Sequence, residues 1–450
     1  MNNSQTHRLW PWPGFPTSSK ALGSFGDANC MEQLLVYCAN AIENNDATLS
    51  HQILWVINNI ASPDGDSNQR LTCAFLRALI VRAAMIGTSE IVTAMARAMN
   101  YPNLAPQTHR FSVLELANFV DLTPWHRFGF TAANAAILDA VEGYSAIHIV
   151  DLSLTHCMQI PTLIDAIATR LDGPPLIKLT VAGLIEDIPP IVDLFSYDEM
   201  GLKLVNFARS RNISLVFKVI PCSSSDGFAR LIEYLRILQQ QQQLLAAHDE
   251  ALVINCQMTL HCIPDETAIN ITNSDSPYNS FSSSCPVSSS SSSTSPLSAR
   301  AMFLKAIRSL NPTTVVLVDE DAYFTTNDLV DRLRSAFNYL WIPYDTVDTF
   351  LPRGSKQRQW YEAYIRWKIE NVIAHEGFDR VERQEPKGRW AERMREANFR
   401  AVAFGEAAAT EVKIMLDEHA AGWGSKKAED NLVLTWKGHN VVFATAWVPA

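Results

Sequence analysis

The first third of the chain has the hydrophobic spacing of amphipathic helices. From Met31 to Ile42 apolar residues recur at intervals of three and four, and Asn29 can cap the first turn. The same spacing predicts further helices over 48–61, 67–86, 89–99, 110–121 and 125–141. The chain therefore begins with a mainly helical block over 29–145.

From residue 146 the pattern changes to that of buried strands. Short runs of apolar and β-branched residues alternate with amphipathic stretches typical of helices. The runs cover 146–151, 176–183, 213–220, 251–256, 313–319 and 399–404, and the stretches cover 158–171, 193–211 and 226–247. This alternation predicts an α/β core over 146–450 with a doubly wound, mostly parallel sheet.

The end of the chain predicts a different strand arrangement. Two apolar runs within 431–447 flank the turn-forming residues Lys437–Asn440. Such a pattern is typical of an antiparallel hairpin, and the edge of a parallel sheet is the natural place for one.

Two segments lack the spacing of a packed element. Residues 1–28 form a Trp- and Pro-rich stretch without helical periodicity, which we expect to be a disordered tail. Residues 276–297 are rich in serine, which favours a flexible insertion. The alternating pattern continues on both sides of the insertion, so we expect one domain over 29–450.

The charge distribution excludes some function classes and leaves one local candidate. The 450 residues carry a net charge of −10, which argues against non-specific binding to nucleic acid or to an anionic membrane. Residues 353–395 are the exception, with 11 basic and 7 acidic residues. One hypothesis is a basic rim that contacts DNA phosphates or an acidic partner, and the other is a network of ion pairs. The rim residues are Arg358, Lys387, Arg389, Arg393 and Arg395.

The cysteines and the terminus point to a reduced, intracellular protein. The eight cysteines lie mostly in apolar runs and show no Cys-x-x-Cys pair, so we expect neither a disulfide nor a zinc site. Cys256, His261 and Cys262 come nearest to a metal cluster but lack a second ligand pair, which favours core packing. No signal peptide or membrane-spanning run is present in the sequence.

The sequence shows no catalytic constellation. A nucleotide or S-adenosylmethionine site needs glycines after the first strand, so that the backbone can approach the ligand. The loop after Asp151 has none, and Leu152 and Leu154 would add bulk there. His148 and Asp151 are three apart on one strand and so point to opposite faces. We expect no cofactor and no catalysis.

Several ordered motifs are nevertheless similar to those of a known family. They resemble the GRAS proteins, plant transcriptional regulators, and most closely the scarecrow-like members. The leucine-rich regions correspond to about 29–95 and 193–220, and Cys157–Ile160 replaces the usual Gly-x-Gln-Trp. The VHIID-type motif comprises Ile147, His148, Ile149, Val150 and Asp151. The PFYRE-type motif comprises Pro312, Phe337, Tyr339, Arg380, Val381, Glu382 and Arg383. The SAW-type motif comprises Trp423, Gly424, Trp436, Thr445, Ala446 and Trp447.

The resemblance implies a function and partners. It implies a methyltransferase-like, Rossmann-like core with an N-terminal helical cap, acting as a nuclear transcription regulator without a cofactor. Implied partners are other transcription factors, such as zinc-finger proteins, and a second GRAS protein or a second copy, with no membrane. Promoter DNA would be reached directly or through a partner, and the acidic net charge favours the partner. Two alternatives remain open: a methyltransferase-like enzyme, and a small-molecule receptor that uses the core pocket.

Overall fold

The computed structural model describes residues 28–87, 90, 93, 109–170, 173–192, 196–244, 250–265 and 298–450. Residues 1–27 of the expected tail and the Ser-rich insertion lie outside these residues, as does most of the helix expected over 89–99. None of the helices in the described part of the chain combines the length and apolarity needed to span a bilayer.

The described elements alternate much as the hydrophobic pattern predicts. The helices are α1 (Ala28–Glu43), α2 (Ala47–Ile60), α3 (Ser67–Ile86), α5 (Val113–Val120), α6 (Pro124–Ala140), α7 (Ile160–Ala168), α8 (Ser196–Ser210), α9 (Ala229–Leu244), α11 (Ala299–Ser309), α12 (Leu329–Phe350), α13 (Lys356–Ala374), α14 (Lys387–Glu396) and α15 (Glu406–Asp417). The strands are β1 (Arg110–Phe111), β2 (Ala146–Ser153), β3 (Leu176–Leu184), β4 (Ile191–Val192), β5 (Ser214–Cys222), β6 (Glu250–Gln257), β7 (Thr314–Glu320), β8 (Phe399–Val402), β9 (Trp423–Ala428), β10 (Asn431–Trp436) and β11 (His439–Pro449). Single-turn 3₁₀ helices occupy η1 (Leu260–Cys262) and η2 (Gly377–Asp379).

The large sheet contains nine strands within the described residues. The order along the sheet is β5-β3-β2-β6-β7-β11-β10-β9, and β8 pairs with β11. The first five strands are parallel, and the helices α7, α8, α9 and α11 provide the crossovers that parallel pairing requires. The chain moves outward from β2 to β3 and β5, and then returns to the other side of β2 with β6 and β7. The order therefore reverses between β2 and β6.

The C-terminal strands confirm the hairpin and correct one prediction. β10 and β11 are antiparallel, and β11 pairs antiparallel with β7. β9 adds an outer strand that the hydrophobic pattern missed, because four of its six residues are exposed. The run at 399–404 is expected to continue the parallel series, but β8 runs antiparallel to β11.

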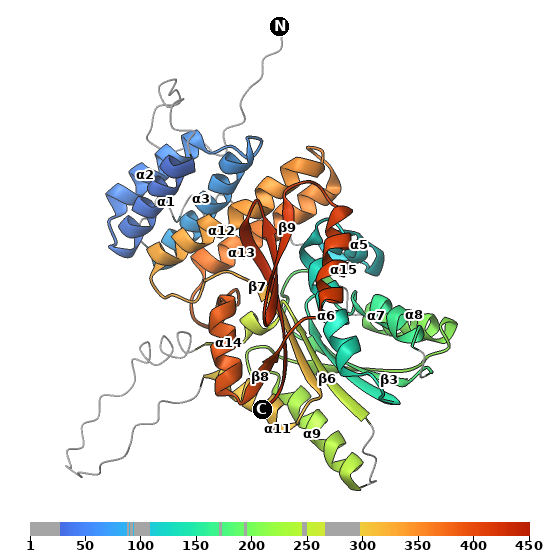
Figure 1. Ribbon diagram of the computed structural model, residues 1–450. Coiled ribbons are helices and arrows are strands. Elements are labelled where there is room, and N and C mark those ends of the chain that lie inside the picture. The colour runs from blue at the N-terminus through green and yellow to red at the C-terminus, as the bar shows by residue number, and fades with distance from the viewer. Residues whose placement is uncertain are drawn as a thin grey trace, which may run out of the picture.

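The helices cover both faces of the sheet, and two late helices join the N-terminal block. α9, α11 and α14 bury one face, while α6 covers the opposite face. α12 and α13 pack directly against α1 and α3, although nearly 250 residues separate them in sequence (Figure 1). The resulting helical layer, α1 to α3 with α12 and α13, is called the cap below.

The segment 110–121 differs from its prediction as a single helix. Arg110 and Phe111 form a short parallel pairing with β4, and α5 begins only after them. Ser112 ends the strand and caps the helix, because its side chain accepts from the Glu115 backbone N–H and Glu115 bonds back to Ser112.

Candidate functional site

The VHIID-type motif is the interior of strand β2. Ile147 and Ile149 are fully buried on one face and Val150 on the other, as expected for a central parallel strand. His148 is 4% exposed, and its Nε2 lies 2.8 Å from the Thr180 hydroxyl. Burial lowers the pKa of His148 to about 4, although Glu250 acts in the opposite direction. This histidine is therefore a neutral core residue.

Asp151 begins a buried amide network at the point where the strand order reverses. Its carboxylate accepts from Asn255 Nδ2 at 2.7 Å and from Ser153 Oγ at 2.8 Å. Burial raises the pKa of Asp151, while these hydrogen bonds act to lower it. Asn255 Nδ2 also donates to Gln159 Oε1 at 2.8 Å, and Gln257 Nε2 donates to the same oxygen.

The Gln159 side chain fills the crevice between the ends of β2 and β6. It is 2% exposed, and its Nε2 donates to Asn134 of α6 at 2.9 Å. In open α/β sheets a ligand binds in this crevice. Here four buried polar side chains satisfy one another in that space. We call this set, Asp151, Gln159, Asn255 and Gln257, the crevice network.

The two leucines proposed as bulk in the cofactor position have other roles. Leu152 is in β2 and packs in the hydrophobic cluster on the opposite face of the sheet, with α9 and α11. Leu154 packs in the hydrophobic cluster on the sheet face that α6 covers, and it lines a pocket. Gln159, Asn255 and Gln257 were not predicted as the filling residues. Asn255 and Gln257 had a signal in the sequence, because these polar residues end the apolar run of β6, whereas Gln159 lies outside the strands, at the start of α7.

This pocket lies beyond β3 and β5 and has a volume of about 440 Å³. Its lining is mainly apolar. Glu186, the acidic residue that follows β3, accepts from the Ser224 backbone N–H at 2.9 Å and from Ser225 N–H at 3.4 Å. One oxygen of this carboxylate therefore holds the turn that precedes α9.

The PFYRE-type residues are buried, except for the partly buried Val381, and two of them belong to the cap helix α12. Pro312 is buried ahead of β7. Phe337 contacts Phe75 of α3 with ring centroids 5.5 Å apart, and Tyr339 donates its hydroxyl proton to the Val441 carbonyl at 2.7 Å. Arg380 donates to the Phe324 carbonyl at 2.9 Å, and Arg383 pairs with Asp265 at 3.2 Å. Val381 packs against the main hydrophobic cluster.

Glu382 belongs to a buried charge cluster under the cap. It lies 3.2 Å from Lys368 Nζ of α13 and 3.6 Å from His261 Nε2. Burial acts to lower the pKa of His261, but Asp319 at 2.8 Å, together with Cys262 and Glu382, raises it well above its usual value. Asp319 thus occupies His261, the residue placed near Cys256 and Cys262 in the metal hypothesis. Within the described residues, no group of three such side chains is arranged to hold a metal, and the seven described cysteines are free thiols.

The SAW-type residues stack the C-terminal strands on the cap. Trp423 and Trp436 contact one another with centroids 4.9 Å apart, and Trp436 Nε1 donates to Asp345 of α12 at 2.7 Å. Gly424 pairs with Thr435 on the neighbouring strand. The remaining residues, Thr445, Ala446 and Trp447, are buried in β11.

The structure does not assemble the expected basic rim. Arg358 is 6% exposed and contacts Asp348 and Glu362. It belongs to α13, whereas the other four residues belong to α14. Arg393 is 5% exposed and forms a two-point pair with Glu385, both contacts being 2.7 Å.

The other three rim residues also have partners. Lys387 donates to Asn431 at 2.9 Å, Arg389 pairs with Glu392 at 3.0 Å, and Arg395 approaches Asp430 at 3.7 Å. Four of the five residues are therefore in ion pairs within the chain, and those of Arg358 and Arg393 are buried.

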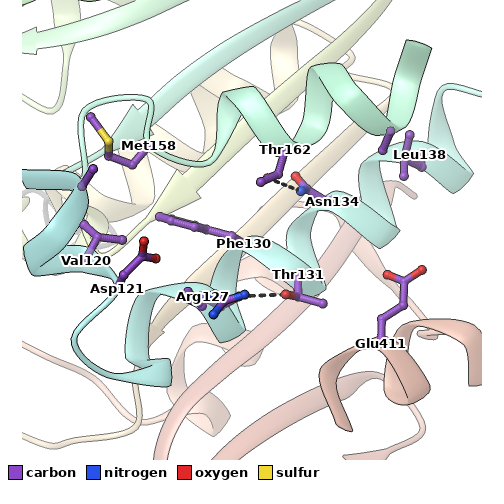
Figure 2. Close-up of a pocket in the computed structure, with 12 residues that line it drawn as sticks. Val120, Asp121, Arg127, Phe130, Thr131, Asn134, Leu138, Met158, Thr162 and Glu411 are labelled. Carbon is purple, nitrogen blue, oxygen red and sulfur yellow. Dashed lines mark hydrogen bonds between the residues drawn. The ribbon is translucent and has the colours of Figure 1, made fainter. Parts of the chain in front are cut away.

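An open groove lies beside α6 (Figure 2). It has a volume of about 360 Å³ and lies between the end of α5, α6, α7 and α15. Val120, Phe130, Leu138 and Met158 supply apolar surface. Asn134 lines the groove and also bonds Gln159, so one side chain joins the two regions. We call this the α6 groove.

The α6 groove has an acidic rim. Asp121 and Glu411 are exposed and lie on opposite sides of it (Figure 2). In the part of the chain that the structure describes, neither carboxylate has an ion-pair partner. Arg127 also lines the groove, but Glu418 neutralises it at 3.0 Å. The groove therefore presents apolar surface with two uncompensated negative charges.

Comparison with known proteins decides the family. The GRAS domain family matches residues 31–448. This chain belongs to the GRAS family. It is 57% identical to Scarecrow-like protein 32 of Arabidopsis thaliana over 97% of each chain. It is 26% identical to the Scarecrow-like transcription factor PAT1 of Arabidopsis thaliana, over 92% of this chain and 75% of the relative.

A solved GRAS structure shares the fold. The crystal structure of SCL7 in Oryza sativa superposes with a TM-score of 0.68 at 21% identity, covering 93% of this chain and 99% of that one. The similarity confirms a mixed α/β fold with a multi-stranded sheet and many helices.

The GRAS motifs of this chain are mainly packing residues. Most VHIID-, PFYRE- and SAW-type side chains are buried and bonded within the chain. The exposed α6 groove carries none of them. The motifs therefore identify the fold, whereas the open surface has to be found from the structure.

Proposed function

We propose that this protein is a nuclear regulator of plant transcription that acts by binding other proteins, without catalysis and without a cofactor. Membership of the GRAS family supports the regulatory role, since relatives of this chain are named as transcription factors. We further propose that the core is Rossmann-like, because the order reverses between β2 and β6 as in doubly wound nucleotide-binding folds.

The filled crevice is the observation that favours binding over catalysis. Four side chains of the crevice network occupy the ligand position of such folds and are at most 2% exposed. A ligand would have to displace their hydrogen bonds, and each buried polar group left unpaired costs about 1–3 kcal/mol. We therefore expect S-adenosylmethionine to give no saturable heat up to millimolar concentrations. A micromolar dissociation constant would overturn the non-enzymatic proposal.

The α6 groove is the surface that we propose for partner docking. Its apolar floor and two uncompensated carboxylates fit a basic, amphipathic segment of a DNA-binding protein. DNA-binding proteins carry such positive charge, whereas this chain has a net charge of −10. In this arrangement promoter DNA is reached through the partner.

A reporter assay tests the docking surface. The full chain, without an added DNA-binding domain, is expressed in plant cells with a reporter driven by a promoter that the wild type occupies in chromatin. It is tested as wild type, as Asp121→Lys with Glu411→Lys, and as a control with Glu233→Lys and Asp331→Lys. The control reverses two exposed charges outside the groove. We expect the groove variant to lose most of its effect on the reporter and the control to keep it. Equal activity of all three proteins would contradict docking at the groove, and no effect of the wild type would contradict the regulatory role.

A further inference from the structure

A polar pocket lies in the cap, at residues that belong neither to the crevice network nor to the α6 groove. It forms where the loop between α2 and α3, Pro63–Gly65, meets the loop between α12 and α13, Arg353–Gly354. One side of α13 completes it, and its volume is about 260 Å³. Four arginines line the pocket: Arg70, Arg353, Arg358 and Arg366. We call it the arginine pocket.

The two inner arginines are neutralised by a shared pair of carboxylates. Arg70 contacts Asp348 at 2.8 Å and Glu362 at 3.2 Å. Arg358 contacts the same Asp348, and its Nε donates to Glu362 at 3.0 Å. The side chains of both arginines are less than a tenth exposed. These four groups form a balanced, rigid base for the pocket.

The two outer arginines retain unused hydrogen-bond donors. Arg366 is 38% exposed and reaches only one oxygen of Glu362, at 3.8 Å. Arg353 donates once, to the Asp64 backbone carbonyl at 3.3 Å. A guanidinium has five N–H donors, so most donors of both groups have no acceptor within the described part of the chain. Asp64 also lines the pocket, so the formal charges of Arg353, Arg366 and Asp64 leave an excess of one positive charge.

We infer that the arginine pocket binds a phosphate monoester. A phosphate carries between −1.5 and −2 charges at neutral pH and three strong acceptor oxygens, which match the fork geometry of two guanidinium groups. The pocket is slightly smaller than the roughly 300–1,000 Å³ of sites for drug-sized ligands, so the group that carries the phosphate is small. A phosphorylated serine or threonine of a partner and a free phosphate ester share this chemistry.

The site has a consequence for the cap. Its walls come from α3 and α13, which are far apart in the sequence. Arg70 of α3 and Glu362 of α13 are in contact although 292 positions separate them. A bound phosphate would link Arg353 of the α12–α13 loop to Arg366 of α13 beside the α2–α3 loop. Because Arg353 also donates to the Asp64 carbonyl, the bound phosphate would hold the α12–α13 loop where it meets the α2–α3 loop.

Calorimetric titration of the full chain tests the inference. The titrants are inorganic phosphate, O-phosphoserine and an acetylated, amidated Ala-phosphoserine-Ala peptide, with sodium chloride at matched ionic strength. The test variant is Arg353→Ala with Arg366→Ala. The control, Arg209→Ala with Arg334→Ala, removes the same charge from exposed positions on α8 and α12. Circular dichroism and thermal midpoints verify that all variants are folded.

We expect saturable binding by the wild type and the control, and at least tenfold weaker binding by the pocket variant. A further variant with Arg353→Lys and Arg366→Lys keeps the charge but loses the fork, so its affinity should be intermediate. If the peptide binds more strongly than inorganic phosphate, the site is assigned to a phosphorylated partner. If the two bind equally, the site is assigned to a free phosphate ester. Absence of saturable binding below 10 mM, or equal binding by wild type and pocket variant, would overturn the inference.

Discussion

The crevice network and the α6 groove are connected through Asn134, but they use polar side chains in opposite ways. In the crevice, Asp151, Gln159 and their partners are buried and bonded to one another. At the groove, Asp121 and Glu411 are exposed and unpaired among the described residues. The difference separates groups that hold the fold from groups available to a partner. It predicts that changes to the first class reduce stability, while changes to the second reduce binding alone.

The largest expected effect is the loss of a buried charge pair. Arg393→Ala should lower the free energy of unfolding by about 3 kcal/mol, because it removes the two-point partner of the buried Glu385, which then keeps only Arg300 at 3.3 Å. Arg389→Ala is the matched control, since both members of its pair are about half exposed, and it should change stability by less than about 0.5 kcal/mol. Urea denaturation measures both. Similar small losses for the two variants would mean that the Arg393–Glu385 pair does not stabilise the fold, and would support a functional role for Arg393.

Removal of the central amide should have the next largest effect. Gln159→Ala leaves donors of Asn255 and Gln257 unpaired, so we expect a loss of about 2–3 kcal/mol. The exposed Gln357→Ala on α13 is the control and should be near neutral. Comparison of urea midpoints at constant slope gives the difference. A Gln159 variant as stable as the control would mean that the crevice network does not support the fold.

The buried histidine of the core predicts a dependence on pH. His148 has a folded-state pKa of about 4, against about 6.5 when unfolded. Between these values the unfolded chain binds a proton that the folded chain does not, so stability falls as the pH is lowered. From pH 7 to pH 5 this residue should account for a loss of about 2 kcal/mol.

His148→Gln removes the titrating group and keeps a partner for Thr180. We expect its unfolding free energy to fall less than that of the wild type between pH 7 and pH 5, by about 2 kcal/mol. His439→Gln, at the exposed start of β11, should behave like the wild type. Parallel pH profiles for wild type and His148→Gln would refute the assignment of a neutral core histidine.

The smallest stability effect is expected at the groove. Asp121→Lys with Glu411→Lys changes charges that have no ion-pair partner among the described residues, so the thermal midpoint should hardly move and stability should stay within about 0.5 kcal/mol. A large loss of stability would place these carboxylates with the structural groups and remove the contrast between crevice and groove.

Several elements were predictable from local spacing. The helices α1 to α3, the parallel strands β2, β3, β5, β6 and β7, and the β10–β11 hairpin match the periods of the sequence. The glycine-free loop after Asp151 indicated an unusual crevice. β9 was missed, because an exposed edge strand has no apolar alternation to detect.

The site itself was less predictable. The five residues of the proposed rim look alike in sequence, yet Arg358 and Arg393 are buried while Arg389 and Arg395 are exposed. Burial of an arginine depends on which carboxylates the fold brings close. The α6 groove combines residues from four helices, so no short motif could have indicated it.

The sequence by itself determined the family, the order of helices and strands, and the parallel core, because apolar periodicity and motif order are local properties of the chain. Only the tertiary structure decided that α12 and α13 complete the cap, that Gln159 fills the crevice, and that Arg353 and Arg366 remain open to solvent. These outcomes depend on contacts between residues up to about 300 positions apart. Hydrophobic burial brings such residues together with little regard to their separation in sequence.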